Sequence, residues 1–74
     1  MSNPTFDTKK FIAARWGSPD RLYRWLAEYG YAVQRQQIYK QVQRGSIPAE
    51  QFAVMLGLLE MQNGKPASLV EYLK

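Results

Sequence analysis

The segment Gln34–Gly45, QRQQIYKQVQRG, concentrates side chains that can recognise other molecules. It holds five glutamines, two arginines and one lysine, and it has no acidic residue. Ile38 and Val42 lie four residues apart, the spacing of neighbours on one face of a helix. A glutamine amide can pair with adenine through two hydrogen bonds, and arginine or lysine can contact guanine O6 and N7. The segment therefore predicts a helix with two inward residues and an outer face suited to reading bases.

The residues away from the Ile38–Val42 edge are the candidates to contact bases or phosphates. Arg35 stands in the first turn and could reach either group, whereas Tyr39 adjoins the core pair and could either pack or contact DNA. The other five candidates are Gln36, Gln37, Lys40, Gln43 and Arg44. A solvated polar helix face is the alternative interpretation of the same pattern.

The preceding segment, 18–30, has the signals of a second short helix. Ser18 is a good N-cap, Pro19 suits the first helical position, and Gly30 suits the end. Two short helices joined by a tight turn, the second polar and basic, form a helix-turn-helix. The first helix would then lie across the DNA backbone, with Ser18, Arg21 and Arg24 as candidate phosphate contacts. Solvent exposure alone is an equally good explanation for the two arginines.

The net positive charge lies in the first part of the chain. Residues 1–45 carry eight cations and three anions, a net charge of +5, whereas residues 46–74 carry two cations and three anions, a net charge of −1. A basic half of this kind favours a polyanionic partner. The alternative is a basic protein whose charge serves only its solubility.

The remaining segments also have helical periodicity. Asp7 is an N-cap flanked by a predicted hydrophobic staple of Phe6 and Phe11. Pro48 opens a fourth helix with Phe52, Leu56 and Leu59 as its apolar stripe, and PASLVEYLK, 66–74, could form two further turns. No alternating runs or hairpin dipeptides suggest strands. We predict an all-α fold: a compact four-to-five-helix bundle in one domain, 1–74, with its core at about 7–62 and a C-terminal segment at 63–74.

Three stretches resemble the lambda-repressor-like domains, in particular the small Cro/YdaS-like regulators of phages and prophages. They are SPDRLYRWLA (18–27), IYKQV (38–42) and RGSIPAE (44–50), and the resemblance covers roughly residues 8–62. It implies a transcriptional regulator or repressor that binds double-stranded DNA sequence-specifically, as a dimer on a two-fold operator. Two departures leave the register of the recognition helix open by about one position. The connection between the paired helices is about a residue longer, and Gly30 stands earlier than the family's turn glycine.

The half of the chain without excess positive charge is the predicted dimer interface, because two basic faces would repel each other. Its apolar residues exceed what one short helix needs. The candidates are Met55, Leu58, Met61, Leu69, Tyr72 and Leu73. The alternative is that they complete the core of the monomer, since a chain this small has little core to spare.

The residue types argue against an enzyme. The chain has no histidine and no cysteine, and its six carboxylates are scattered along the helices. It also lacks a glycine-rich phosphate loop. We therefore expect no catalytic residues, no cofactor, no metal and no small-molecule substrate.

The sequence also bears on location and on a rival function. We find neither a signal peptide nor an apolar run near the ~20 residues that a membrane span needs. We expect a cytoplasmic protein of a bacterium or a phage-infected host cell. The competing prediction is a small helical phage-type inhibitor or adaptor that binds a protein and not DNA.

Overall fold

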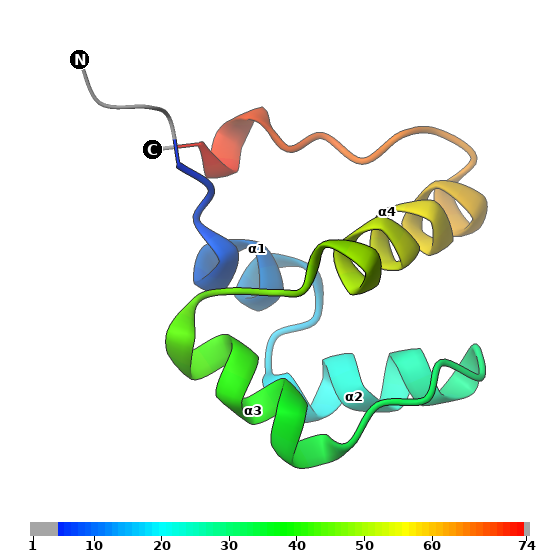
Figure 1. Ribbon diagram of the computed structural model, residues 1–74. Coiled ribbons are helices and arrows are strands. Elements are labelled where there is room, and N and C mark those ends of the chain that lie inside the picture. The colour runs from blue at the N-terminus through cyan, green and yellow to red at the C-terminus, as the bar shows by residue number, and fades with distance from the viewer. Residues whose placement is uncertain (1–4, 74) are drawn as a thin grey trace.

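The chain folds into four α-helices and one turn of 3₁₀ helix (Figure 1). The computed structural model describes residues 5–73. The elements are α1 (Thr8–Arg15), α2 (Pro19–Glu28), α3 (Arg35–Arg44), α4 (Ala49–Asn63) and η1 (Val70–Tyr72). Within residues 5–73 the only β pairing is an isolated bridge between Phe6 and Leu73. The predicted all-α fold is confirmed, and none of the described helices is long and apolar enough to cross a membrane.

The first two helices begin where the sequence predicts. The Asp7 carboxylate accepts the Lys10 N–H at 3.2 Å, and the Ser18 hydroxyl accepts the Arg21 N–H at 3.3 Å. Each cap satisfies one of the N–H groups that a helix leaves without an internal partner. Phe6 and Phe11 form the predicted staple, with ring centroids 5.4 Å apart. Local sequence signals therefore set the start of both helices.

Two glycines end the helices of the central pair. Gly30, after α2, and Gly45, after α3, have φ angles of 79° and 71°, which favour glycine because it has no Cβ. The Ser46 N–H donates to the Gln41 carbonyl at 3.0 Å and the Gly45 N–H to that of Val42 at 3.2 Å, the paired bonds of a Schellman motif. The connection between α2 and α3, residues 29–34, is longer than a tight turn.

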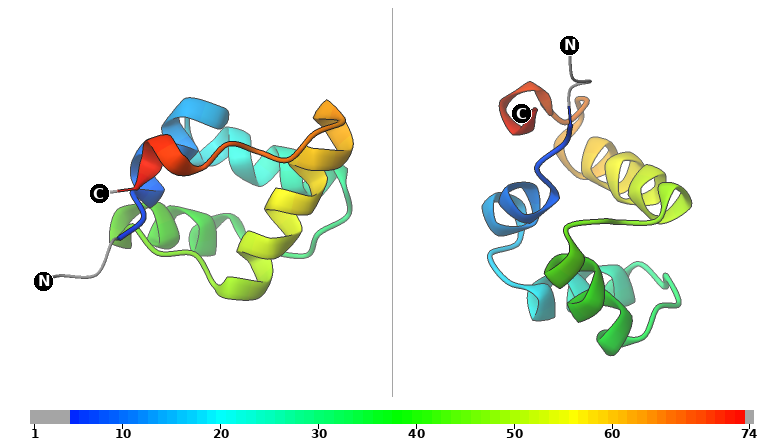
Figure 2. Two further views of the ribbon diagram at one scale, coloured as in Figure 1. Left: turned by 90° about the horizontal axis from the view of Figure 1, so that it is seen from above. Right: turned by 60° about the vertical axis from the view of Figure 1, so that its left-hand side comes forward.

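The helices surround one small core. α3 packs against α2 and α1. In the right-hand view of Figure 2, α4 lies beside α1 and above α2 and α3. The side chains that are completely buried come from all four helices: Phe11, Ile12, Leu22, Leu26, Ile38 and Met55. In α4 the buried row is Gln51, Met55 and Leu59. The predicted α4 stripe was therefore partly wrong, because Phe52 and Leu56 are only half-buried at its edge.

The C-terminal segment closes the core from the side of α1. It forms one 3₁₀ turn and not two helical turns, because Leu73 is extended and pairs with Phe6. Tyr72 is only 3% exposed, its ring centroid lies 5.3 Å from that of Phe11, and its carbonyl accepts the Asp7 N–H at 2.6 Å. Burial raises the pKa of the Tyr72 hydroxyl, and the neighbouring Glu71 raises it further. Both ends of the described chain thus meet at one aromatic residue.

Replacing Tyr72 should test this closure. We expect Tyr72→Ala to lower the free energy of unfolding by about 3–5 kcal/mol, because it empties an aromatic site in the core. Val70→Ala, in the same turn but 73% exposed, should change it by less than about 0.5 kcal/mol. Urea denaturation followed by circular dichroism measures both. Equal effects of the two substitutions would show that the turn does not dock as described.

Candidate nucleic-acid interface

Helix α3 presents a polar and cationic face to solvent. Ile38 is its one fully buried side chain, and Val42 and Gln41 are half-buried beside it. The exposed residues of the helix are Arg35, Gln36, Gln37, Tyr39, Lys40, Gln43 and Arg44. These are the seven residues predicted from the sequence to contact bases, and no carboxylate lies among them. Tyr39 is 45% exposed, so it does not belong to the core.

The exposed glutamines differ in whether their amides are free. The Gln37 Oε1 accepts the Gln34 N–H at 3.1 Å, which caps the start of α3. A two-bond contact with adenine uses both the oxygen and the nitrogen of the amide. The cap occupies one of the two lone pairs of the Gln37 oxygen and restricts where its amide can point. Gln36 and Gln43 make no side-chain hydrogen bond within residues 5–73 and keep both groups available.

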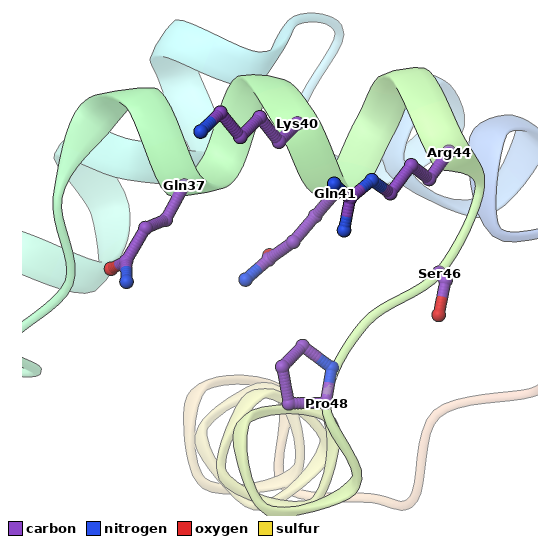
Figure 3. A pocket seen from close by; sticks show the side chains of 6 residues that line it. All are labelled: Gln37, Lys40, Gln41, Arg44, Ser46 and Pro48. Atoms are coloured by element: carbon purple, nitrogen blue, oxygen red, sulfur yellow. The ribbon is translucent and has the colours of Figure 1, made fainter.

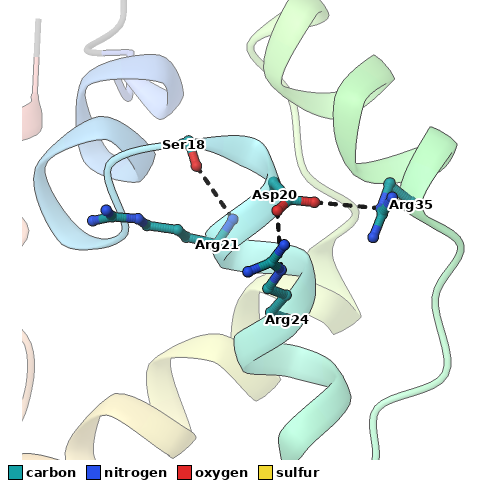
Figure 4. A network of polar contacts seen from close by, with 5 residues as sticks. All are labelled: Ser18, Asp20, Arg21, Arg24 and Arg35. Carbon is teal, nitrogen blue, oxygen red and sulfur yellow. Dashed lines mark hydrogen bonds and ion pairs between the residues drawn. The ribbon is translucent and has the colours of Figure 1, made fainter.

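An ion-pair network joins the N-terminal ends of α2 and α3 (Figure 4). The Asp20 carboxylate lies 3.0 Å from the Arg24 Nε through one oxygen and 3.4 Å from the Arg35 Nε through the other. The Arg35 guanidinium also stands 5.1 Å from the centre of the Tyr23 ring, within the range of a cation–π contact. Two predicted contacts from different helices are thereby held side by side.

The other candidate phosphate contacts of α2 stand at the same end of the molecule. Ser18 is the N-cap, so its hydroxyl already accepts a hydrogen bond from the Arg21 backbone. The Arg21 side chain is exposed and lies close to Gly17. Arginines 21, 24 and 35 therefore surround the start of α2, where free N–H groups also favour an anion.

A groove of about 310 Å³ runs along α3 from Gln37 to Arg44, between this helix and the start of α4 (Figure 3). Its lining residues are Gln37, Lys40, Gln41, Arg44, Ser46 and Pro48. Lys40 and Arg44 supply two positive charges, and the Lys9 side chain lies beside the adjoining Gly45. Cations thus stand near both ends of the exposed face of α3.

A glutamine pair that sequence reasoning missed fixes α3 to α4. The Gln41 Nε2 donates to the Gln51 Oε1 at 2.9 Å, and the Gln51 Nε2 donates back to the Gln41 Oε1 at 2.7 Å. Gln51 is only 3% exposed, so its amide depends on this partner. The spacing of Gln51, Met55 and Leu59 was the available signal, because it places Gln51 in a buried row.

The six residues predicted to form a dimer interface differ in how deeply they are buried. Met55 and Tyr72 are 0% and 3% exposed, so they belong to the monomer core and cannot reach a second chain while the fold is intact. Leu58 and Leu69 are half-buried. Met61 and Leu73 are exposed at 66% and 53%, and Val70, which the sequence analysis did not select, is exposed at 73%.

Comparison with known proteins gives no match: the chain matches no protein-family model, no curated protein and no solved structure at a significant level. Within residues 5–73 no cluster of three or more histidine, cysteine, aspartate or glutamate side chains could hold a metal ion. The candidate interface is therefore described by the charge and hydrogen-bonding capacity of its own residues.

The glutamine pair can be tested by a mutant cycle. Gln51→Leu should lower the free energy of unfolding by about 1–3 kcal/mol, because it leaves the half-buried Gln41 amide without its partner. Gln41→Leu with Gln51→Leu should recover much of that loss, since two apolar groups can pack together. Gln43→Leu, on the exposed face, is the matched control and should change stability by less than about 0.5 kcal/mol. The cycle also needs the single variant Gln41→Leu. If the loss of stability in the double variant equals the sum of the losses in Gln41→Leu and Gln51→Leu, the pairing is contradicted.

Proposed function

We propose that this protein binds double-stranded DNA and recognises its sequence with α3. One observation carries the proposal: every exposed side chain of this helix is polar, aromatic or cationic, and none is acidic, while a single buried residue anchors the helix. A helix can enter the major groove, where each base pair presents a distinct pattern of donors and acceptors. Gln36, Lys40 and Gln43 are the side chains best placed to read that pattern.

The cations at both ends of α3 support a phosphate contact on each side of the groove. α3 is about 15 Å long at 1.5 Å per residue, comparable to the ~12 Å width of the major groove. Arg21 and Arg24 would meet one strand at the start of α2. Arg44 would meet the other strand beside the start of α4. Phosphate contacts of this kind set the position of the reading helix but carry no sequence information.

A transcriptional regulator that acts as a dimer is the biological role that fits this proposal. One helix-turn-helix reads about half a turn of DNA, and a second copy related by two-fold symmetry doubles the contacts. The exposed apolar residues Met61, Val70 and Leu73 belong to the half of the chain with net charge −1. Pairing through that half would leave both α3 helices free for DNA.

The same exposed residues favour a second candidate function. Met61, Val70 and Leu73 are large apolar side chains left in solvent, and such surfaces mark protein contacts when they gather in one patch. A small adaptor or inhibitor would use one or more of these side chains to bind a protein and would not bind DNA. Binding to duplex DNA therefore discriminates between the two candidates.

Selection of bound duplexes from a random pool should enrich one sequence motif. A two-fold motif with half-sites about 34 Å apart would support the dimer, and a single half-site would support a monomer.

The salt dependence of binding is a second test. If about five cations per protomer neutralise phosphates, the logarithm of the DNA-binding constant should fall with the logarithm of the salt concentration at a slope near −4 to −5 per protomer. Fluorescence anisotropy with a labelled duplex measures the slope. No enrichment together with salt-independent binding would reject DNA binding.

Substitutions should distinguish the residues that recognise bases from those that contact phosphates. Lys40→Ala should cost about 1–3 kcal/mol on the selected site and weaken the discrimination at one base pair. Arg21→Ala should reduce the affinity for all duplexes alike, because a phosphate contact is independent of sequence. Lys40 is a cleaner choice than Gln37, whose loss also removes the helix cap. Competition assays with single-base variants of the site measure both, and unchanged preferences in Lys40→Ala would exclude Lys40 as a reader.

A further inference from the structure

The carboxylate of Asp20 is an acidic group in the most cationic part of the molecule. It stands between Arg24 of its own helix and Arg35 of α3 (Figure 4). If α3 faces DNA, this negative charge lies near the phosphates and opposes binding. Its place in the first turn of α2 suits the helix dipole, but the dipole does not explain the contact with a second helix.

Stability is also a poor explanation for the network. The Arg24 and Arg35 side chains are 72% and 54% exposed, and Asp20 is 30% exposed. Ion pairs with this much solvent contact contribute little to folding. The effect of Asp20 that remains is geometrical: it restricts where the two guanidinium groups stand.

Two contacts hold the Arg35 guanidinium by different parts. Its Nε faces the Asp20 Oδ1 at 3.4 Å, and its central carbon, Cζ, lies over the Tyr23 ring, 5.1 Å from the ring centre. An arginine has five N–H donors in a rigid plane, and a partner at Nε leaves the four on the two terminal nitrogens. Those nitrogens form a fork whose spacing matches two acceptors on one molecule.

We propose that Asp20 determines sequence specificity by holding Arg35 so that its terminal fork pairs with one guanine. This inference rests on the proposed function. The first residues of a recognition helix reach base edges, and Arg35 is the first residue of α3. Guanine presents O6 and N7 side by side in the major groove, the two acceptors that such a fork fits. Asp20 itself touches no base and acts as a positioning residue.

Asp20→Asn tests the proposal because its two effects have opposite signs. Removal of one negative charge should raise the affinity for unrelated duplexes. Loss of the support for Arg35 should lower the discrimination at one G·C pair by about two- to fivefold, the range that an exposed ion pair provides. Competition assays with the selected site and its single-base variants measure both quantities. Circular dichroism and thermal unfolding check that the variant is folded.

Glu28→Gln is the matched control. Glu28 stands at the other end of the same helix and forms no ion pair with the residues that the structure describes. This substitution removes the same charge, so the affinity for all duplexes should rise alike with no change in discrimination. An Asp20→Asn variant that behaves like Glu28→Gln would overturn the inference and leave DNA binding itself intact.

Variants of Arg35 complete the test. Arg35→Lys keeps the positive charge, but an ammonium group can contact guanine only without the rigid spacing of the fork. It should therefore reduce discrimination at the same base pair, and it tests the inference even if Asp20→Asn does not fold. In an Arg35→Gln background, Asp20→Asn should no longer alter discrimination, because the group that it positions is gone. Discrimination that stays unchanged in Arg35→Lys would overturn the inference. Absence of sequence preference in the unaltered protein would instead reject the proposed function.

Discussion

The burial of Ile38 is the interaction on which the exposed face of α3 depends. Ile38 is the only fully buried side chain of a ten-residue helix. An isolated helix of this length is marginal in water, so α3 is held mainly by its contacts with other helices. Ile38 inserts into the core cluster that holds Leu22, Leu26 and Met55. Because one residue and its half-buried neighbours provide the anchor, the remaining positions are free to be polar.

The Gln41–Gln51 pair adds a directional constraint to this anchor. Hydrophobic burial is non-directional, so Ile38 alone would let α3 rotate or slide. Two amide hydrogen bonds of 2.9 and 2.7 Å have preferred distances and angles, and they join α3 to α4 at one place. At the other end, Asp20 joins α3 to α2 through Arg35. Ile38 therefore anchors α3, the Gln41–Gln51 pair fixes its position against α4, and the exposed Asp20–Arg35 contact orients one side chain at its start.

The sequence predicted what depends on neighbouring residues. The caps at Asp7 and Ser18, the glycine that ends α3 and the exposed face of α3 follow local rules of spacing and side-chain chemistry. Features that depend on residues far apart in the chain were missed or left open. Nothing near Gln51 indicates that it pairs with Gln41, and the sequence left open whether Tyr72 completes the core or meets a second chain. Such contacts exist only after the helices have packed.

The internal hydrogen bonds also limit how much sequence α3 could read. Four glutamines lie within α3, but the Gln37 Oε1 accepts the Gln34 backbone N–H, and Gln41 is bound to Gln51. Of the α3 glutamines, Gln36 and Gln43 alone keep free amides, with no side-chain hydrogen bond within residues 5–73. If each free amide and each of Lys40 and Arg35 read one base, a single protomer would specify only about four base pairs. A genome offers about 10⁶–10⁹ competing sites, so on the proposed function a lone copy would be too unspecific, and pairing with a second copy would be a physical requirement of recognition.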